Sequence, residues 1–520
     1  MRWRHWLATG FLAACTAALA AAQEPKAGDY YEDNTDLGFR VRMPARWESV
    51  PPAPDDGNLI IKFDPKTAKT IQLGPNTTLG LHAWIVKLDR RASATAAEKA
   101  DGRYVQRHKT LAAWLEANVS KGLAAGSSKP KELEVDKVKA VEQVLSNGAS
   151  KLEVRVYTMT FKIHPEVDVA VVFNGPGDPK KWSKYENVFE EMARSFRRVE
   201  VAAAKPALAE GASMRDKKRA ELVDYVTRTP GWKLHETPSY FIISANDDRT
   251  FLDELKGRLE AIRAVYEQDY PAAKVEEIRK LAAQVKTGEG ASQKAEDAVA
   301  KVEASTAESM EMSRCSIVRV CRSRDDYMSY GAPAGSGGYF DFNSRELVIY
   351  DDKANRGRNF TWLVLNHEAF HQYIFYFYGN IAPHSWYNEG TGDYYSGYVY
   401  KNGRFTLEKN LERRDEIKEA IQNSRQARLA DLMRWDQKTY YGNGDHSVGL
   451  QNYAQGWSLV YFLRTGKKNN AKHWDPKWDT LLEDYLRVLA ATGKPEQAIE
   501  QCLTGVDVEA LEAAWLEYTK

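Results

Sequence analysis

The pentapeptide His367-Glu368-Ala369-Phe370-His371 limits the structures open to this chain more than any other segment. Two histidines four residues apart on a helix share one face, so both imidazoles can bind one metal ion. Residues 361–378 contain no Pro or Gly and carry apolar residues at helical spacing, which predicts a helix with an apolar side and a polar metal face. The alternative is a pair of core histidines whose ring nitrogens bond to backbone carbonyls.

A second segment, Trp386-Tyr387-Asn388-Glu389-Gly390-Thr391-Gly392-Asp393, contains a candidate third ligand. A catalytic zinc site takes three protein ligands and keeps one coordination position open. Glu389 lies 18 positions after His371 (389 − 371) and suits this role. Glu368, beside the first histidine of the pair, would then reach water bound to the metal. The two segments together predict a zinc-hydrolase site.

The same residues carry a family resemblance. The motif from His367 to His371, followed by Asn388-Glu389-Gly390 and Asp393, resembles the gluzincin metallopeptidases, the group that contains thermolysin and aminopeptidase N. It is most similar to their bacterial peptidase-MA-like branch. The resemblance extends from residue 218 to the C-terminus and implies a thermolysin-like domain with a small sheet and a mainly helical C-terminal part.

The resemblance also implies a role for each residue of the motif. His367, His371 and Glu389 would bind one Zn²⁺ ion per chain, and Glu368 would be the general base. Asp393 lies one helical turn after Glu389, where its carboxylate can accept a hydrogen bond from His367 and fix the tautomer of that imidazole. The alternative is that Asp393 is a carboxylate on the helix surface, since acidic residues are common near a helix N-terminus.

A third segment, residues 452–461, resembles the part of aminopeptidase-type gluzincins that supplies a transition-state tyrosine. Tyr453 lies 64 positions after Glu389 (453 − 389), a separation that suits this family. Its phenol would donate a hydrogen bond to the oxyanion of the tetrahedral intermediate. Two alternatives stay open: Tyr453 packs in the core, or His446 is the oxyanion donor.

Residues 335–341 and 345–350 read as a hairpin that turns at Asn343-Ser344. In the resembled family such a hairpin precedes the metal helix and offers an edge strand to an extended peptide. The alternative is that its glycines form only a flexible loop. The chain lacks the Gly-x-Met-Glu-Asn motif with which aminopeptidase N binds a free amino terminus, and this argues against an aminopeptidase.

These patterns predict an exported peptidase that hydrolyses peptide bonds through a zinc-bound water and a glutamate general base. Two other functions use the same residues. One is a catalytically silent protein that binds zinc, a peptide or a partner; the presence of Glu368, Glu389 and Asp393 together counts against it. The other is an amidase that acts on a non-peptide or cell-wall amide.

Export is predicted from residues 1–22, which we interpret as a secretory signal. Two arginines precede an apolar run from Trp6 to Ala20, and small residues follow, so cleavage is expected before Gln23. In the alternative reading, Leu12-Ala13-Ala14-Cys15 is a bacterial lipobox and Cys15 carries a lipid anchor. No later segment has the roughly 20 apolar residues that a membrane span needs. We therefore expect a periplasmic or secreted protein, or a lipoprotein, without a membrane span.

The cysteine content limits the possible disulfide bonds, and the charge content limits the classes of partner. Cys315, Cys321 and Cys502 allow one disulfide at most, and the first two are predicted in one strand, too far apart to bridge. A bond from either to Cys502 stays open. The chain has 73 basic and 72 acidic residues, so no basic surface favours nucleic acid or anionic lipid. A peptide or protein substrate is the partner that the family resemblance implies.

A chain of 520 residues is too long for a single core, so more than one domain is expected. Residues 30–200 combine strand-like alternation with a helical stripe and resemble PsbP-like α/β domains, which implies an antiparallel sheet flanked by helices and a binding or positioning role. The members of the stripe are Trp182, Tyr185, Phe189, Met192 and Phe196.

The rest of the chain divides at an Ala-rich segment. Residues 201–217 are predicted to be a linker and residues 218–520 the peptidase domain. Within that domain, residues 272–312 are rich in Ala, Lys and Glu and are expected to form a charged helical insertion, which is either a solvated face or a partner-binding hairpin. The predicted fold class is α+β.

Overall fold

The computed structural model describes residues 25–33, 36–66, 70–74, 77–94, 105–123, 128–148, 154–201, 211–274, 276–277, 280, 308–333, 335–378, 383–468 and 474–520. The chain divides into two compact units, and the boundary between Ala204 and Lys205 lies within the predicted linker. One short segment of the N-terminal part, Val50–Asp56, is grouped with the second unit. The predicted signal, including Cys15, and most of the predicted charged insertion lie outside the described residues.

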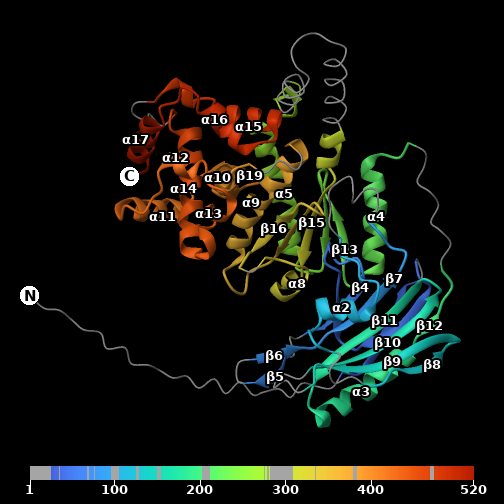
Figure 1. Cartoon of the computed structure of the whole chain (residues 1–520). Helices are drawn as coiled ribbons and strands as arrows, with labels where there is room; N and C mark the ends of the chain where they lie inside the picture. The colour runs from blue at the N-terminus through green and yellow to red at the C-terminus, as the bar shows by residue number, and fades with distance from the viewer. Residues whose placement is uncertain are drawn as a thin grey trace, which may run out of the picture. The chain divides into compact units, whose positions relative to one another are not determined.

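The first unit is built on a seven-stranded sheet of order β3-β4-β7-β11-β10-β9-β8 (Figure 1). Every pair from β4 to β8 in this order is antiparallel. The strands are β3 (Trp47–Val50), β4 (Leu59–Pro65), β7 (Ala83–Asp89), β8 (Lys131–Val135), β9 (Val138–Ser146), β10 (Val154–His164) and β11 (Val167–Pro176). A smaller sheet joins β1 (Ala27–Asp33), β2 (Phe39–Pro44) and β12 (Arg197–Arg198), and β5 (Thr70–Gly74) pairs with β6 (Thr77–Gly80).

Alternate residues of the large sheet face two separate cores, as the two-residue period of a strand requires. Odd-numbered residues of β10 and β11, such as Met159 and Val171, pack with α3 (Pro179–Arg194), while even-numbered ones, such as Val156 and Val172, pack with α2 (Leu111–Asn118). The α3 residues of the predicted stripe are buried. Phe196 lies beyond the end of that helix and stacks on Phe161, with ring centroids 3.9 Å apart. The predicted antiparallel sheet with flanking helices is confirmed.

The second unit contains a five-stranded mixed sheet of order β13-β14-β15-β17-β16. Its strands are β13 (Lys233–Glu236), β14 (Tyr240–Ser244), β15 (Ser316–Cys321), β16 (Gly338–Asp341) and β17 (Glu346–Tyr350). The two central pairs are parallel, and the outer pairs are antiparallel. The predicted hairpin is confirmed, since Asp341 pairs with Glu346, and its first strand, β16, forms one edge of the sheet.

Helices cover both faces of this sheet and form the C-terminal part of the chain (Figure 1). Before the sheet is complete come α4 (Met214–Arg228), α5 (Arg249–Asp269) and α8 (Arg324–Ser329). After it come α9 (Arg358–Tyr378), α10 (Ser385–Ser396), the hairpin β18 (Tyr398–Lys401) and β19 (Arg404–Leu407), α11 (Leu411–Gln422), α12 (Leu429–Leu432), α13 (Gln437–Tyr440), η1 (Gly442–Gly444), α14 (His446–Thr465), η2 (Pro476–Trp478), α15 (Leu481–Thr492), α16 (Pro495–Cys502) and α17 (Val508–Thr519). The predicted α+β class is therefore confirmed.

Two sequence-based questions are answered by this fold. The helix predicted for residues 361–378 is α9, which begins three residues earlier, at Arg358. Cys315, Cys321 and Cys502 are all buried and free, so neither of the first two is bonded to Cys502. Within the part of the chain that the structure describes, no helix has the length and apolar character needed to cross a membrane.

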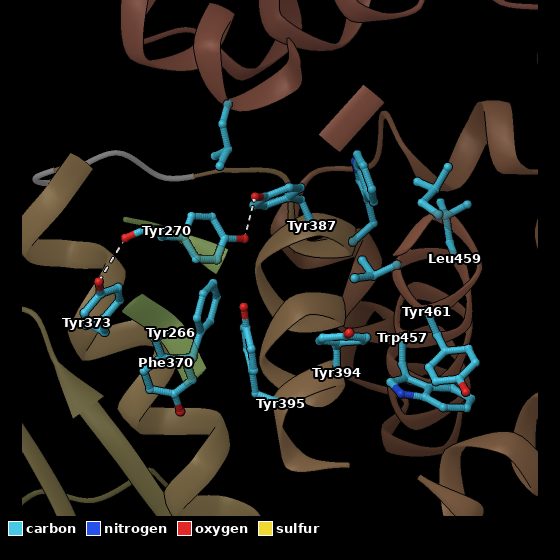
Figure 2. Close-up of a cluster of buried hydrophobic side chains, with 14 of the residues drawn as sticks. Tyr266, Tyr270, Phe370, Tyr373, Tyr387, Tyr394, Tyr395, Trp457, Leu459 and Tyr461 are labelled. Atoms are coloured by element: carbon cyan, nitrogen blue, oxygen red, sulfur yellow. Dashed lines mark hydrogen bonds between the residues drawn. The ribbon is translucent and has the colours of Figure 1, made fainter. Parts of the chain in front are cut away.

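A buried cluster of aromatic residues holds the helices around the site (Figure 2). Tyr266 of α5 donates a hydrogen bond to the carbonyl of Asn366 in α9 and packs edge-on against Tyr395 of α10. Tyr373 of α9 donates to the carbonyl of Tyr270, whose own hydroxyl lies 3.2 Å from that of Tyr387 in α10. Because buried phenols need polar partners, these bonds fix the positions of α5, α9 and α10 relative to one another.

Candidate metal centre

Three predicted ligands converge in the second unit. His367 and His371 lie one turn apart on α9, and Glu389 approaches them from α10. Glu389 Oε2 is 3.1 Å from His367 Nε2 and 3.7 Å from His371 Nε2. All three residues are buried, and their candidate ligand atoms lie within 4.8 Å of one another. The alternative of two core histidines bonded to backbone carbonyls does not describe this arrangement.

The geometry and charge of this group fit a zinc ion. Zinc bonds of about 2.0–2.1 Å in a tetrahedral arrangement separate neighbouring ligand atoms by about 3.3 Å, close to the separations observed here. Two imidazoles and one carboxylate are a donor set that zinc accepts in catalytic sites. The carboxylates of Glu368, Glu389 and Asp393 lie close to one another here, and the guanidinium of Arg413 is paired with Asp393. A divalent cation would balance this excess of negative charge.

The ligand His367 is oriented by a chain of charged partners. Its Nδ1 lies 3.0 Å from Asp393 Oδ1, and Arg413 of α11 donates from Nε to Asp393 Oδ2 at 2.7 Å. A carboxylate at Nδ1 fixes the ring so that Nε2 is directed toward the metal position. Asp393 is only 5 % exposed, so the alternative of a helix-surface carboxylate is wrong.

Protonation in this group follows from the same contacts. Burial alone would lower the pKa of His367, but hydrogen bonds to Asp393 and Glu389 outweigh it and raise that pKa well above its ordinary value. Burial would raise the pKa of Glu389, yet its bonds to His367 and His371 hold it well below the usual range.

Two glycines allow α10 to lie this close to its neighbours. A Cβ atom on Gly392 would be 2.7 Å from Cε1 of His367, and one on Gly390 would be 2.5 Å from the carbonyl oxygen of Gly456 in α14. Such separations exclude any side chain, so only glycine permits this approach of backbone to ring and of helix to helix. The glycines beside Glu389 are therefore part of the means by which the third ligand is positioned.

Glu368 faces the same cleft as the ligands. Its Oε2 accepts a hydrogen bond of 3.0 Å from the backbone N–H of Phe340 in β16. Burial raises the pKa of Glu368 above its ordinary value. A carboxylate that is held by a backbone amide and is more basic than usual suits a general base.

Two predicted oxyanion donors, Tyr453 and His446, line the cleft, and a third residue, Tyr441, contacts a ligand. Tyr453 of α14 lines the cleft, where its ring stacks on that of Tyr441 with centroids 5.8 Å apart, and the guanidinium of Arg413 lies over its ring. The contact to a ligand is made by Tyr441, which donates to Glu389 Oε1 at 2.9 Å. His446 is exposed and also lines the cleft. The oxyanion role of Tyr453 stays a prediction.

Tyr441 and Arg413 were missed by the sequence analysis. Tyr441 lies in a turn between α13 and η1, and Arg413 lies in the first turn of a charged helix. Neither has a fixed spacing from the histidine pair that would mark it out. Both are brought to the site by the folding of the C-terminal helices.

The site opens into a cleft with a volume of about 1270 Å³. Its walls come from β16, α9, α10, the turn around Tyr441, and helices α14 to α16. The cleft contains the ligands, Glu368 and both tyrosines, and it includes apolar side chains such as Phe342 and Leu363. A polypeptide segment, not only a small molecule, fits a space of this size.

Comparison with known proteins returns no match to this chain, either among protein-family models or among curated proteins. The likeness to gluzincins therefore rests on the motif residues themselves. The geometry adds an independent observation, because segments 22 residues apart (389 − 367) meet as one ligand group.

Proposed function

We propose that this protein is an exported zinc-dependent peptidase. The observation that carries the proposal is the convergence of His367, His371 and Glu389 beside Glu368 in one open cleft. Residues 1–22 support a periplasmic or secreted location in this proposal, with a lipid anchor at Cys15 as the alternative. The predicted Zn²⁺ ion would be held by the two imidazoles and by Glu389 Oε2.

When bound, zinc acts as a Lewis acid that polarises a carbonyl and lowers the pKa of water. The chain supplies the proton transfers. Glu368 takes a proton from the attacking water and returns it to the leaving amine. The hydrogen bond from Phe340 N–H keeps the carboxylate of Glu368 at the wall of the cleft through both transfers.

The edge strand β16 supports a peptide as substrate. Phe340 N–H bonds to Glu368 and not to β17, so the backbone polar groups of Phe340 face away from the sheet. Gly338, two residues earlier in the same strand, presents its groups in the same direction. An extended peptide can pair with this edge on either side of Glu368, through backbone groups other than the Phe340 N–H, without any demand on its sequence.

The test uses a mixed peptide library, incubated with zinc-loaded mature protein and analysed by mass spectrometry. The matched variant is Glu368→Gln at equal zinc content, because it removes the base and leaves His367, His371 and Glu389 intact. We expect cleavage by the wild type and a loss of at least about 100-fold in the variant, the contribution of a positioned base. Full activity in Glu368→Gln would overturn the mechanism.

Two other outcomes are informative. If the wild type with stoichiometric zinc cleaves no peptide, the favoured functions become hydrolysis of a non-peptide amide or binding without catalysis. The positions of the cuts, internal or terminal, distinguish an endopeptidase from an exopeptidase.

A further inference from the structure

The wall of the cleft beside Glu368 contains a cluster of three phenylalanines, which we call the aromatic wall: Phe340, Phe342 and Phe375. Their ring centroids lie 5.0, 5.5 and 5.8 Å apart, each pair edge to face. Phe340 is buried, whereas Phe342 is 50 % exposed. Phe342 and Phe375 both line the cleft. An exposed aromatic side chain that lines a cleft beside a reactive group is placed to contact an apolar part of a ligand.

The aromatic wall belongs to an apolar stripe on α9. Leu363 lies one turn before His367, and Phe375 lies one turn after His371, so both share the face of the metal ligands. Leu363 is 39 % exposed and lines the cleft as well. The polar ligand pair is therefore flanked along the helix by apolar side chains on both sides.

Strand β16 runs beside α9 in the same direction. Gly338 lies against Val364 near the start of the helix, Phe340 contacts Glu368 at its middle, and Phe342 contacts Phe375 near its end. A peptide paired with the edge of β16 would thus pass Glu368 and reach the aromatic wall within one or two residues, since strands advance about 3.3 Å per residue.

We propose that the aromatic wall is the subsite for a large apolar side chain of the substrate. This inference rests on the proposed function and narrows its substrates to extended peptides with an aromatic or large aliphatic residue at one fixed position beside the cut. Phe342 is the residue that determines this preference, because its exposed face is the part of the wall that a substrate side chain would cover.

The test compares cleavage patterns of zinc-loaded wild type, Phe342→Ala and Tyr30→Ala on a mixed peptide library. Tyr30 is the control, since it is an aromatic residue of similar exposure, 40 %, and does not line the cleft. In the wild type we expect enrichment of Phe, Tyr, Trp, Leu and Met at one position relative to the cut. Phe342→Ala should lower the preference for Phe over Ala there by about tenfold, and Tyr30→Ala should retain it. Equal zinc content in the three proteins shows that the site is intact.

The outcomes separate this inference from the function on which it rests. Cleavage with no positional preference, or with a preference that Phe342→Ala retains, overturns the subsite and keeps the peptidase. If the wild type cleaves nothing, the library is captured on immobilised, zinc-loaded Glu368→Gln. If the captured peptides are rich in large apolar residues, and this enrichment is lost in the double variant Glu368→Gln/Phe342→Ala, the subsite is supported without turnover. Capture of peptides without such enrichment overturns the subsite.

Discussion

Glu389 has two carboxylate oxygens, and the structure gives them different partners. Oε2 faces both histidines. Oε1 accepts hydrogen bonds from the Tyr441 hydroxyl at 2.9 Å and from the Asn388 side-chain amide at 3.2 Å. Because Oε1 is occupied by these donors, Glu389 offers a single oxygen to the metal. Tyr441 is thus a positioning residue that acts through the ligand.

Replacing Tyr441 by Phe removes one of these donors and leaves the ring stack with Tyr453 in place. We expect the affinity for zinc to fall by about 10- to 100-fold, the usual effect of losing a partner of a metal ligand. Competition with a zinc-chelating dye measures the zinc affinity of the wild type and of the variant. Tyr453→Phe is the comparison: if Tyr453 donates to the oxyanion, this variant lowers kcat and retains zinc affinity. Unchanged zinc affinity in Tyr441→Phe would contradict the positioning role.

At the scale of the element, α9 and the β16–β17 hairpin were predictable because their signals are local. Helical spacing of apolar residues in 361–378 and strand patterns on either side of Asn343-Ser344 follow from the backbone geometry of each element alone. The start of α9 at Arg358, three residues before the predicted start, lies within the usual error of a helix end predicted from sequence. The motif also located Glu389 and Asp393, since the resemblance fixes their spacing.

Contacts between elements were not predictable in the same way. Arg413 reaches Asp393, and Tyr441 reaches Glu389, only after α11 and the turn following α13 have folded onto α10. Phe340 contacts Glu368 through its backbone N–H, a group that every non-proline residue carries and that no sequence pattern marks. These contacts form through tertiary packing, so the local conformational preferences of each segment do not predict them.

The approach of α10 to α9 gives a prediction for Gly392→Ala. Alanine favours a helix over glycine by about 1 kcal/mol, but here its Cβ would lie 2.7 Å from the ring of His367. We expect a net loss of about 1–3 kcal/mol of unfolding free energy, as for other overpacked positions, together with weaker zinc binding. Chemical denaturation and a zinc titration measure the two effects.

The matched control for this change is Gly257→Ala in α5. A Cβ there would meet only the hydroxyl end of the Tyr400 side chain, which can move aside. We therefore expect Gly257→Ala to retain both stability and zinc affinity. If Gly392→Ala behaved like this control, close packing against His367 would not be what requires glycine in α10.

At the scale of the whole molecule, each of the two compact units has its own hydrophobic core. All three candidate ligands lie in the second unit, and no such group of ligands is found among the residues of the first unit that the structure describes. The sequence predicted a division near residues 201–217 from composition alone. The grouping of Val50–Asp56 with the second unit was not predicted from the sequence.

This separation predicts two thermal transitions, of which zinc shifts one. A ligand that binds only the folded second unit stabilises it by about 2.7 kcal/mol at 100 times its Kd, while the first unit gains nothing. Differential scanning calorimetry with and without zinc measures both transitions.

Two variants assign the transitions to the units. Phe189→Ala, in the core of the first unit, should destabilise only that unit, by about 3–5 kcal/mol of unfolding free energy, and so lower only the transition that zinc does not shift. His371→Ala should abolish the zinc shift. A single transition, or two that move together with zinc, would mean that the units unfold as one, and the first unit would then contribute to the stability of the metal centre.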